Sequence, residues 1–276
     1  MDVLRYAAFT DDPAGGNPAG VVLDAAGATA AQMLAVAADV GYAETAFVVA
    51  RPGERRVVVR YFSPRAEVPF CGHATVATAV ALAARHGDGE FTVETAVGEV
   101  ALRVAAGRAS FTSVEPSVAE FTDAQLAEVL DLFGLVAGDL DEDCPPRMAA
   151  AGNPNPLLVL READRFDGFT FDPARARRVL DDNGWPATLT VALRRGPLVF
   201  ETRNVFPVGT LTEDPATGSA AAALGGYLRA LGLIQPPARV LVHQGRHVGR
   251  PGLLTVDVPP TGGIVVTGTA VPLPAA

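Results

Sequence analysis

The chain has 276 residues, a net charge of −9 and a pI of about 4.9. This acidic balance argues against nucleic acid or an anionic membrane surface as a partner, because both favour a basic surface. All 22 basic residues are arginines. The absence of lysine excludes a pyridoxal-phosphate aldimine and the lysine of a P-loop ATPase. The 49% hydrophobic content can build a substantial core.

The first part of the chain alternates short strands with helices. Thr29 and Gln32 form a capping box that predicts a helix over residues 30–40, ending at Gly41. An alanine-rich segment predicts a second helix over residues 74–84. Strands are expected over residues 5–9, 19–23, the end of 42–49, 57–62, 91–94, 100–104 and 109–112.

The second part has the same character. Thr122 and Gln125 form another capping box, with a helix to Phe133, and Asp172-Pro173 opens a helix that ends near residue 183. An alanine-rich helix is expected over residues 220–230, and strands over 156–160, 189–193, 199–202, 239–243, 253–258 and 264–268. The mixture predicts the α+β class. The segment after Glu115 is the candidate boundary, which gives halves of 1–115 and 116–261, with 262–276 as a candidate completion of the first half.

No apolar run approaches the roughly 18 residues needed to span a bilayer. The N-terminus also lacks the basic start and apolar core of a signal peptide. We therefore expect a cytoplasmic protein that does not associate with membranes.

Two stretches resemble each other, Glu67-Val-Pro-Phe-Cys-Gly-His-Ala-Thr75 and Glu213-Asp-Pro-Ala-Thr-Gly-Ser-Ala220. Each leads into an alanine-rich helix, and the start of a helix offers free N–H groups and a partial positive charge to an anion. We expect one anion pocket built by two halves. The alternative is a pair of ordinary glycine turns before buried helices.

The similarity extends beyond these two stretches. Residues 16–20 (GNPAG) and 152–156 (GNPNP) precede them at similar spacing, and residues 60–64 (RYFSP) loosely match 203–207 (RNVFP). Three elements that recur in the same order indicate an internal duplication with two similar halves.

Glu44, His73 and Asp214 are the ionisable groups near the repeated turns. A carboxyl group in the apolar context of Glu44 would have a raised pKa and could serve as an acid and a base. The alternatives are a rim carboxylate paired with an arginine for Glu44, a helix-cap role for His73 and a helix N-terminal acid for Asp214. Ser219 is expected either to cap its helix or to bind a substrate carboxylate.

Cys71 raises the possibility of a racemase with two thiols. Aligning Gly72 with Gly218 places Thr217 opposite Cys71, and a threonine hydroxyl is a poor base, so the two-thiol mechanism is disfavoured. His243 and His247 are four residues apart but lie in a predicted strand and turn. We therefore expect no metal site.

Several segments together resemble the PhzF-like phenazine-biosynthesis isomerase family. They are residues 16–21 (GNPAGV), 43–48 (AETAFV), 62–75 (FSPRAEVPFCGHAT), 213–220 (EDPATGSA) and 244–251 (QGRHVGRP). The resemblance implies the diaminopimelate-epimerase-like fold, with two pseudo-symmetric halves, each a curved sheet or barrel around a central helix, and an active site in the cleft. It also implies no metal or organic cofactor, a small carboxylate substrate and a homodimer.

The resemblance further implies roles for individual residues. Glu44 would be the acid/base that moves a proton between substrate carbons, and His73 and Asp214 would assist. Ser219 and the backbone amides of Gly72 and Gly218 would bind a carboxylate. The same motifs contribute Thr217, Ala74 and Asn17 as further candidate substrate-binding residues.

Three hypotheses follow. The leading one is a cofactor-independent isomerase of a small carboxylate, with trans-2,3-dihydro-3-hydroxyanthranilate or an analogue as a candidate substrate. The second is an epimerase or racemase of an amino-acid-like acid that uses the single thiol of Cys71. The third is a non-catalytic scaffold that binds a small acid or a protein.

Overall fold

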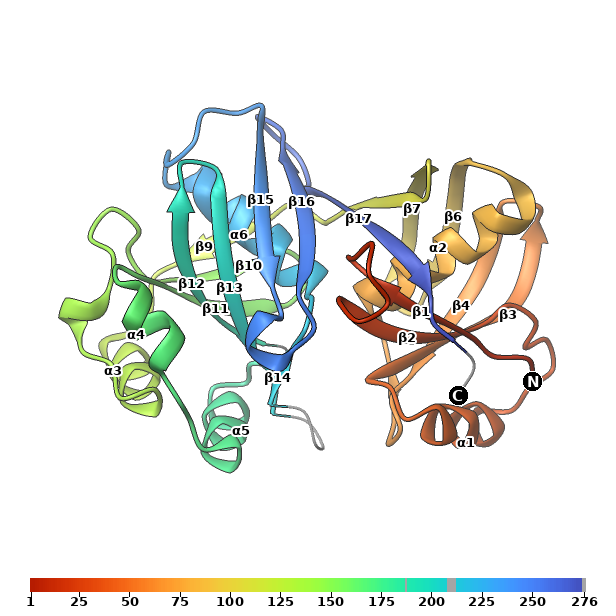
Figure 1. The fold of residues 1–276 in the computed structure, drawn as a ribbon, viewed down its shortest axis with the longest axis horizontal. Coiled ribbons are helices and arrows are strands. Elements are labelled where there is room, and N and C mark those ends of the chain that lie inside the picture. Colours follow the sequence, from red (N-terminus) through yellow and green to blue (C-terminus); the bar gives the residue numbers. More distant parts are fainter. Residues whose placement is uncertain (187, 208–211, 275–276) are drawn as a thin grey trace. The chain divides into compact units, whose positions relative to one another are not determined.

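The computed structural model describes residues 1–186, 188–207 and 212–274 (Figure 1). The chain divides into two compact units. The N-terminal unit comprises Met1–Thr112 with Thr267–Ala276, and the C-terminal unit comprises Ser113–Val266. The sequence-based boundaries, 115/116 and 261/262, lie a few residues away, and the last two residues of the 262–276 range fall outside the described part of the chain.

The N-terminal unit is built from strands with two helices. Its elements are β1 (Leu4–Ala8), β2 (Asn17–Val22), α1 (Ala30–Val40), β3 (Glu44–Gly53), β4 (Arg56–Phe62), β5 (Glu67–Val68), α2 (Gly72–His86), β6 (Gly89–Thr95), β7 (Gly98–Ala105), β8 (Arg108–Thr112) and β17 (Val265–Pro272).

Strand pairing closes this unit around α2. Within the described residues, the pairings run β1–β2–β3–β4–β6–β7–β8–β17 and return to β1. Helix α2 packs against β1, β2, β3, β7 and β8, and Figure 1 shows the strands curving around it. The side chains of α2 are buried almost throughout, and most of them are small, which lets the helix lie close to the surrounding strands.

The C-terminal unit has more helices. Its elements are β9 (Ser117–Ala119), α3 (Asp123–Leu132), η1 (Ala137–Asp139), β10 (Arg147–Ala150), β11 (Pro154–Leu160), α4 (Ala163–Gly168), α5 (Pro173–Asp182), β12 (Leu189–Gly196), β13 (Val199–Val205), β14 (Glu213–Asp214), α6 (Gly218–Ala230), β15 (Ala238–Gln244), η2 (Arg246–Val248) and β16 (Gly252–Val258).

The two units repeat one pattern of strand pairing. In the N-terminal unit, β2 is parallel to β3, β3 antiparallel to β4, β4 antiparallel to β5 and parallel to β6, and β6 antiparallel to β7. Strands β11 to β16 of the C-terminal unit pair in the same order and with the same directions. Helices α2 and α6 follow the matching strands β5 and β14. The predicted duplication and the α+β class are therefore confirmed.

The helix starts and stops follow local chemistry. Both capping boxes are present at Thr29 and Thr122, and Gly41 ends α1 in the left-handed conformation. Asp172 caps α5, with Pro173 at its first position. The sequence analysis missed α4, η1, η2, β5, β9, β10 and β14, which are too short to show a hydrophobic period.

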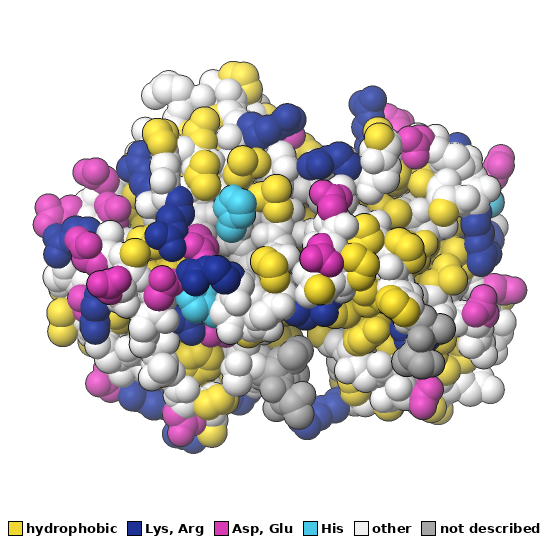
Figure 2. Space-filling model, in the orientation of Figure 1, with side chains coloured by type: hydrophobic (Ala, Val, Ile, Leu, Met, Phe, Trp, Pro, Cys, Tyr) yellow, Lys and Arg dark blue, Asp and Glu magenta, His cyan; other side chains and the backbone are white. Residues whose placement is uncertain are grey.

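Buried apolar side chains give the C-terminal unit its own core, in which Phe166, Leu158, Val191 and Trp185 pack together under α3, α4 and α5. No helix in the described part of the chain is long and apolar enough to cross a membrane. On the face shown in Figure 2, acidic and basic side chains are interspersed in both units rather than segregated by sign.

Candidate active site

Three chemically active side chains meet in the N-terminal unit. The Sγ atom of Cys71 lies 3.5 Å from Oε2 of Glu44 and 3.3 Å from Nδ1 of His73. Nε2 of His73 lies 3.5 Å from the same oxygen of Glu44. A carboxyl group, a thiol and an imidazole therefore form one contact cluster, which we call the Glu44 cluster.

Strand pairing and a helix start bring this cluster together. Glu44 is the first residue of β3 and lies opposite Ala19 of the parallel strand β2. Cys71 is the N-cap of α2, and His73 lies in the first turn of that helix. A Cβ atom on Gly20 would lie 2.6 Å from Oγ1 of Thr45, so glycine lets β2 and β3 run side by side next to Glu44.

Burial controls the charge of His73. Desolvation lowers its pKa from 6.5 to about 4, and a hydrogen bond to the carbonyl of Pro18 partly opposes this shift. The imidazole is therefore neutral near pH 7. The amide Nδ2 of Asn17 lies 3.1 Å from Nδ1 of His73, a contact that orients the ring. The side chain of Glu44 is 13% exposed, compared with 5% for His73, so the carboxyl group is the more accessible of the two.

A second group of predicted residues meets in the C-terminal unit. The hydroxyl of Thr217 donates to Oδ2 of Asp214 over 2.5 Å. The buried Gln244 amide holds both residues, because Nε2 donates to the carbonyl of Asp214 (2.6 Å) and to Oγ1 of Thr217 (2.9 Å). Its Oε1 accepts the backbone N–H of Thr217 (3.1 Å). Gln244 thus fixes the turn that carries Asp214 into α6.

Gly245 completes this arrangement. Its φ of +89° is left-handed, and a Cβ atom there would lie 2.2 Å from the carbonyl oxygen of Arg250 and 2.5 Å from that of Pro215. Both constraints require glycine directly after Gln244.

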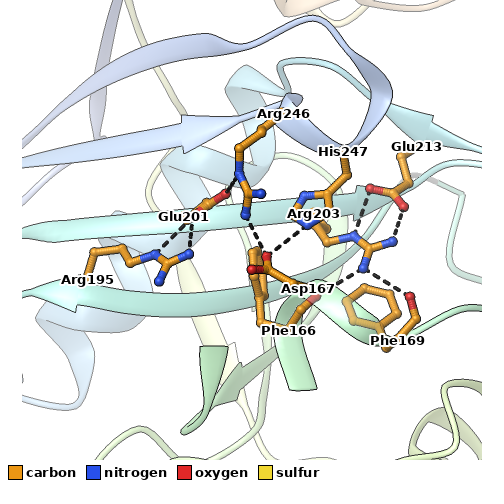
Figure 3. Close-up of polar contacts among 9 residues, drawn as sticks. All are labelled: Phe166, Asp167, Phe169, Arg195, Glu201, Arg203, Glu213, Arg246 and His247. Carbon is orange, nitrogen blue, oxygen red and sulfur yellow. Dashed lines mark hydrogen bonds and ion pairs between the residues drawn. The ribbon is translucent and has the colours of Figure 1, made fainter. Parts of the chain in front are cut away.

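A buried ion pair supports the same turn from β13 (Figure 3). Arg203 donates to both oxygens of Glu213, at 2.6 and 3.2 Å, and through Nη1 to the carbonyls of Phe166 and Phe169, both at 3.0 Å. Its guanidinium also lies 3.6 Å from the centre of the Phe169 ring. Arg203 therefore ties the β13–β14 hairpin, which carries Asp214, to the end of α4.

The structure brings several of the predicted site residues into contact within each unit. Asn17, Glu44, Cys71 and His73 form contacts in one unit, and Asp214 and Thr217 in the other. Gly72 and Gly218 are the first residues of α2 and α6, and Ala74 is buried in α2.

The interpretation of Ser219 as a helix cap is wrong. Thr217 is the N-cap of α6, and Ser219 lies within the first helical turn. The helix begins two residues earlier than the cap prediction requires, because Gly218 already has helical geometry.

The sequence did not identify Arg203 and Gln244 as the residues that hold the turn carrying Asp214. Arg203 appeared only as part of a loose internal repeat. Its counterpart Arg60 pairs with Glu67 in the same way, at 2.6 and 2.7 Å. An Arg and a Glu at matching positions of the repeat could therefore have predicted the ion pair of Arg203. Gln244 appeared only as the start of a family segment.

Residues 6–275 match the PhzC-PhzF family model, described as "Phenazine biosynthesis-like protein". The uncharacterized isomerase YfhB of Bacillus subtilis is 29% identical, over 98% of this chain and 96% of its own length. The trans-2,3-dihydro-3-hydroxyanthranilate isomerase of Pseudomonas fluorescens is 28% identical, over 90% of this chain and 86% of its own.

Solved structures agree with these sequence matches. The PhzF-family phenazine biosynthesis protein of Bacillus anthracis superposes with a TM-score of 0.87 at 27% identity, covering 99% of this chain and 98% of that chain. A hydroxyproline epimerase of Agrobacterium vitis shares the fold, with a TM-score of 0.61 at 15% identity, covering 99% and 90%.

The duplicated units and these fold neighbours define the diaminopimelate-epimerase-like fold. Within that class, the chain belongs to the PhzC-PhzF family, and it is an enzyme of the isomerase type. The resemblance that the motifs suggested is thereby confirmed.

Proposed function

We propose that this enzyme moves a proton between two carbons of a small carboxylate-bearing substrate, and that Glu44 is the group that carries the proton. The observation that carries the proposal is the Glu44 cluster. Its carboxyl group contacts a thiol and a neutral imidazole, and it keeps more exposure than the imidazole. Trans-2,3-dihydro-3-hydroxyanthranilate, the substrate in the name of the Pseudomonas relative, or an analogue is the proposed substrate.

One carboxyl group suits this reaction. Glu44 takes a proton from a carbon next to a conjugated or carboxylate-bearing group and, once protonated, returns it to a second carbon on the same face. General acid–base catalysis of this kind contributes about 10²–10⁴-fold to the rate.

The surrounding groups have supporting roles in the proposal. His73 can hydrogen-bond to a polar group of the substrate without bringing a second charge beside Glu44. Asp214 would hold a substrate polar group, and Ser219 with the amides of Gly72 and Gly218 would bind its carboxylate. Thr217, Ala74 and Asn17 are the remaining proposed binding residues. The proposal requires no metal or organic cofactor.

Proton NMR in D2O with trans-2,3-dihydro-3-hydroxyanthranilate tests the reaction and the base together. We expect the wild-type enzyme to turn over the compound and to introduce deuterium at carbon. Glu44→Gln keeps the size of the side chain but cannot take the proton, so we expect it to lose at least about 10²-fold in rate while still binding the ligand.

A matched control separates this effect from general damage. Glu54→Gln makes the same change at a side chain that is 81% exposed, and we expect wild-type turnover. A Glu44→Gln enzyme with near-wild-type rate would remove Glu44 from the mechanism. A wild-type enzyme that neither converts the compound nor exchanges its hydrogens would remove this substrate, and small carboxylic and amino acids would be screened next for exchange.

The contact of Cys71 with both Glu44 and His73 favours one second candidate, an epimerase that uses a single thiol. This mechanism predicts that alkylation of Cys71 abolishes turnover and that bound substrate protects it. Full activity of Cys71→Ser would eliminate the thiol mechanism and leave the Glu44 mechanism in place.

We further propose a homodimer in the cytoplasm. Sedimentation velocity measures the oligomeric state directly. A mass of one chain at micromolar protein concentration would contradict the homodimer.

A further inference from the structure

The two carboxyl groups that the proposed function uses have different neighbours. Glu44 contacts the thiol of Cys71 and the neutral imidazole of His73, both at 3.5 Å. Asp214 receives the hydroxyl of Thr217 at 2.5 Å, the length typical of a bond from a hydroxyl to an ionised carboxylate. Because neighbours of different kinds favour different protonation states, the contacts around Asp214 indicate its role.

The hydrogen bonds of Gln244 determine the direction of the Thr217 hydroxyl. Nε2 of Gln244 donates to the backbone carbonyl of Asp214 (2.6 Å), and Oε1 accepts the backbone N–H of Thr217 (3.1 Å). A turned amide would place oxygen against the carbonyl and nitrogen against the N–H, so only one orientation satisfies both contacts. The same Nε2 donates to Oγ1 of Thr217 over 2.9 Å. The hydroxyl therefore accepts from Gln244, and its single hydrogen is directed to Oδ2 of Asp214.

Burial strengthens this chain of hydrogen bonds. Gln244 is 2% exposed and Asp214 is 8% exposed, so water competes little for their polar atoms. The chain runs from a neutral amide through a hydroxyl to a carboxylate, and each bond polarises the next one. A hydrogen bond that is donated to a carboxylate favours its ionised form.

We propose that Gln244 is a positioning residue for Asp214. It directs the Thr217 hydroxyl to the carboxylate, which keeps Asp214 ionised and holds it as an acceptor for an amine or hydroxyl group of the substrate. Glu44 then carries the proton, and Asp214 exchanges none with the reacting carbons. The positioning of Asp214 is independent of the substrate, whereas its role toward the substrate rests on the proposed function.

Carbon-13 NMR of the full-length protein, labelled at its aspartate carboxyl carbons, tests the positioning without substrate. The Asp214 signal is the one that disappears in Asp214→Asn. Thr217→Val keeps the size of the side chain and removes the hydroxyl, so we expect it to raise the pH at which Asp214 titrates by about 1–2 units. Thr217→Ser retains a hydroxyl and should titrate like the wild type. An unchanged midpoint in Thr217→Val would overturn the proposal.

A double variant tests whether Gln244 acts through the hydroxyl. Gln244→Met should also raise the midpoint, but in the Thr217→Val background it should add at most a few tenths of a unit, because the bond that it directs is already absent. Additive shifts would mean that Gln244 only holds the turn, and they would overturn its role. Circular dichroism establishes that each variant is folded. If Gln244→Met is not, the comparison of Thr217→Val with Thr217→Ser still decides whether the hydroxyl acts on Asp214.

Thr202→Val is the matched control. The buried hydroxyl of Thr202 donates to Oε1 of Gln244 over 3.4 Å, on the side of the amide that does not donate to Thr217. Its removal should leave the midpoint of Asp214 unchanged. A shift as large as that of Thr217→Val would show that any loss around Gln244 disturbs Asp214, and it would overturn the specific role of the Thr217 hydroxyl.

Ligand binding tests the role of Asp214 as an acceptor. 3-Hydroxyanthranilate is the aromatic analogue of the proposed substrate, anthranilate lacks its hydroxyl group, and 3-hydroxybenzoate lacks its amine. The group that Asp214 accepts from is the one whose removal weakens binding more in the wild type than in Asp214→Asn. We expect this difference to reach about tenfold for one of the two groups, measured by calorimetry. Equal losses in both proteins for both groups would overturn the acceptor role.

Turnover separates this inference from the proposed function. In an active enzyme, Thr217→Val should raise KM by about tenfold and change kcat by less, because a weakened binding contact acts on both the ground state and the transition state. A loss confined to kcat would assign Asp214 to proton transfer and overturn the acceptor role. The expected titration in an enzyme that neither exchanges hydrogen nor binds the three compounds would count against the proposed function and the acceptor role, and the positioning by Gln244 would stand.

Discussion

Because His73 is neutral at physiological pH, it does not weaken Glu44 as a base. If the ring were protonated, it would form an ion pair with Glu44 at 3.5 Å, which would stabilise the carboxylate and weaken it as a base. Burial prevents this by lowering the pKa of His73 to about 4. The same burial links the stability of the fold to pH.

We predict that stability falls as pH drops from about 6.5 to about 4. The folded-state pKa of His73 lies below its value of 6.5 in the unfolded chain. Between these values the unfolded state therefore binds more protons, and acidification favours unfolding. The contribution of His73 is fully present above pH 6.5, and about 3 kcal/mol is lost by pH 4.

Urea unfolding between pH 7.5 and 4.5 measures this effect. His73→Asn should lose less stability than the wild type over this range, whatever its stability at pH 7.5. His243→Asn alters an exposed ring and should follow the wild type. Parallel pH profiles for wild type and His73→Asn would show that burial does not perturb this group.

The members of this cluster could be named from the sequence, but their contacts could not. Glu44, Cys71 and His73 stood out because of their chemistry and their motifs. Their meeting depends on the parallel pairing of β2 with β3 and on where α2 begins. The local sequence pattern does not show which distant segments pair in this way. The contact of Cys71 with both partners was accordingly unforeseen.

At the level of elements, the duplication has given one ion pair two different environments. The β4–β5 hairpin carries Arg60 with Glu67, whose side chains are 33% and 43% exposed. The β13–β14 hairpin carries Arg203 with Glu213, which are 8% and 9% exposed. The buried copy also holds the carbonyls at the end of α4, so it supports the turn that carries Asp214.

We predict that Arg203→Met destabilises the protein by about 3–5 kcal/mol, because it leaves the carboxylate of Glu213 buried without its partner. Arg60→Met is the matched control at the exposed copy and should cost about 0–1 kcal/mol. Urea unfolding at pH 7 measures both.

The double variant Arg203→Met/Glu213→Gln completes the test. Removing both charges should cost clearly less than the sum of the single changes, because no unpaired ion remains. Additive losses, or equal effects at Arg203 and Arg60, would contradict an energetic role for burial.

For the whole molecule, the repeated motifs predicted two similar halves, and the strand pairings repeat accordingly. The boundaries expected from the sequence, 115/116 and 261/262, lie within a few residues of those of the two compact units. Strand β17 is last in sequence, yet it pairs with β1, with Tyr6 opposite Pro272, and the N–H of Phe9 donates to the carbonyl of Thr269 over 2.7 Å. Local pattern predicted a strand over residues 264–268, but it could not show that this strand pairs with β1.

This topology makes the two units unequal as isolated fragments. Residues 113–266 are continuous and contain the large aromatic and aliphatic core. Residues 1–112 lack β17, so the ring of strands around α2 stays open, and Phe9 loses Gly268, where a Cβ atom would lie 2.1 Å from its ring. An open edge exposes unpaired N–H and C=O groups of β1 and β8 and favours aggregation.

We therefore predict that residues 113–266 alone unfold cooperatively on heating, whereas residues 1–112 alone do not. Joining residues 267–276 to the fragment 1–112 through a flexible glycine–serine linker should restore a cooperative transition, because the closing strand returns. Circular dichroism melts of the three proteins measure this. A cooperative transition in residues 1–112 without β17 would show that ring closure is dispensable, and its failure to return with the linked strand would show that the N-terminal unit needs more of the chain than its own strands.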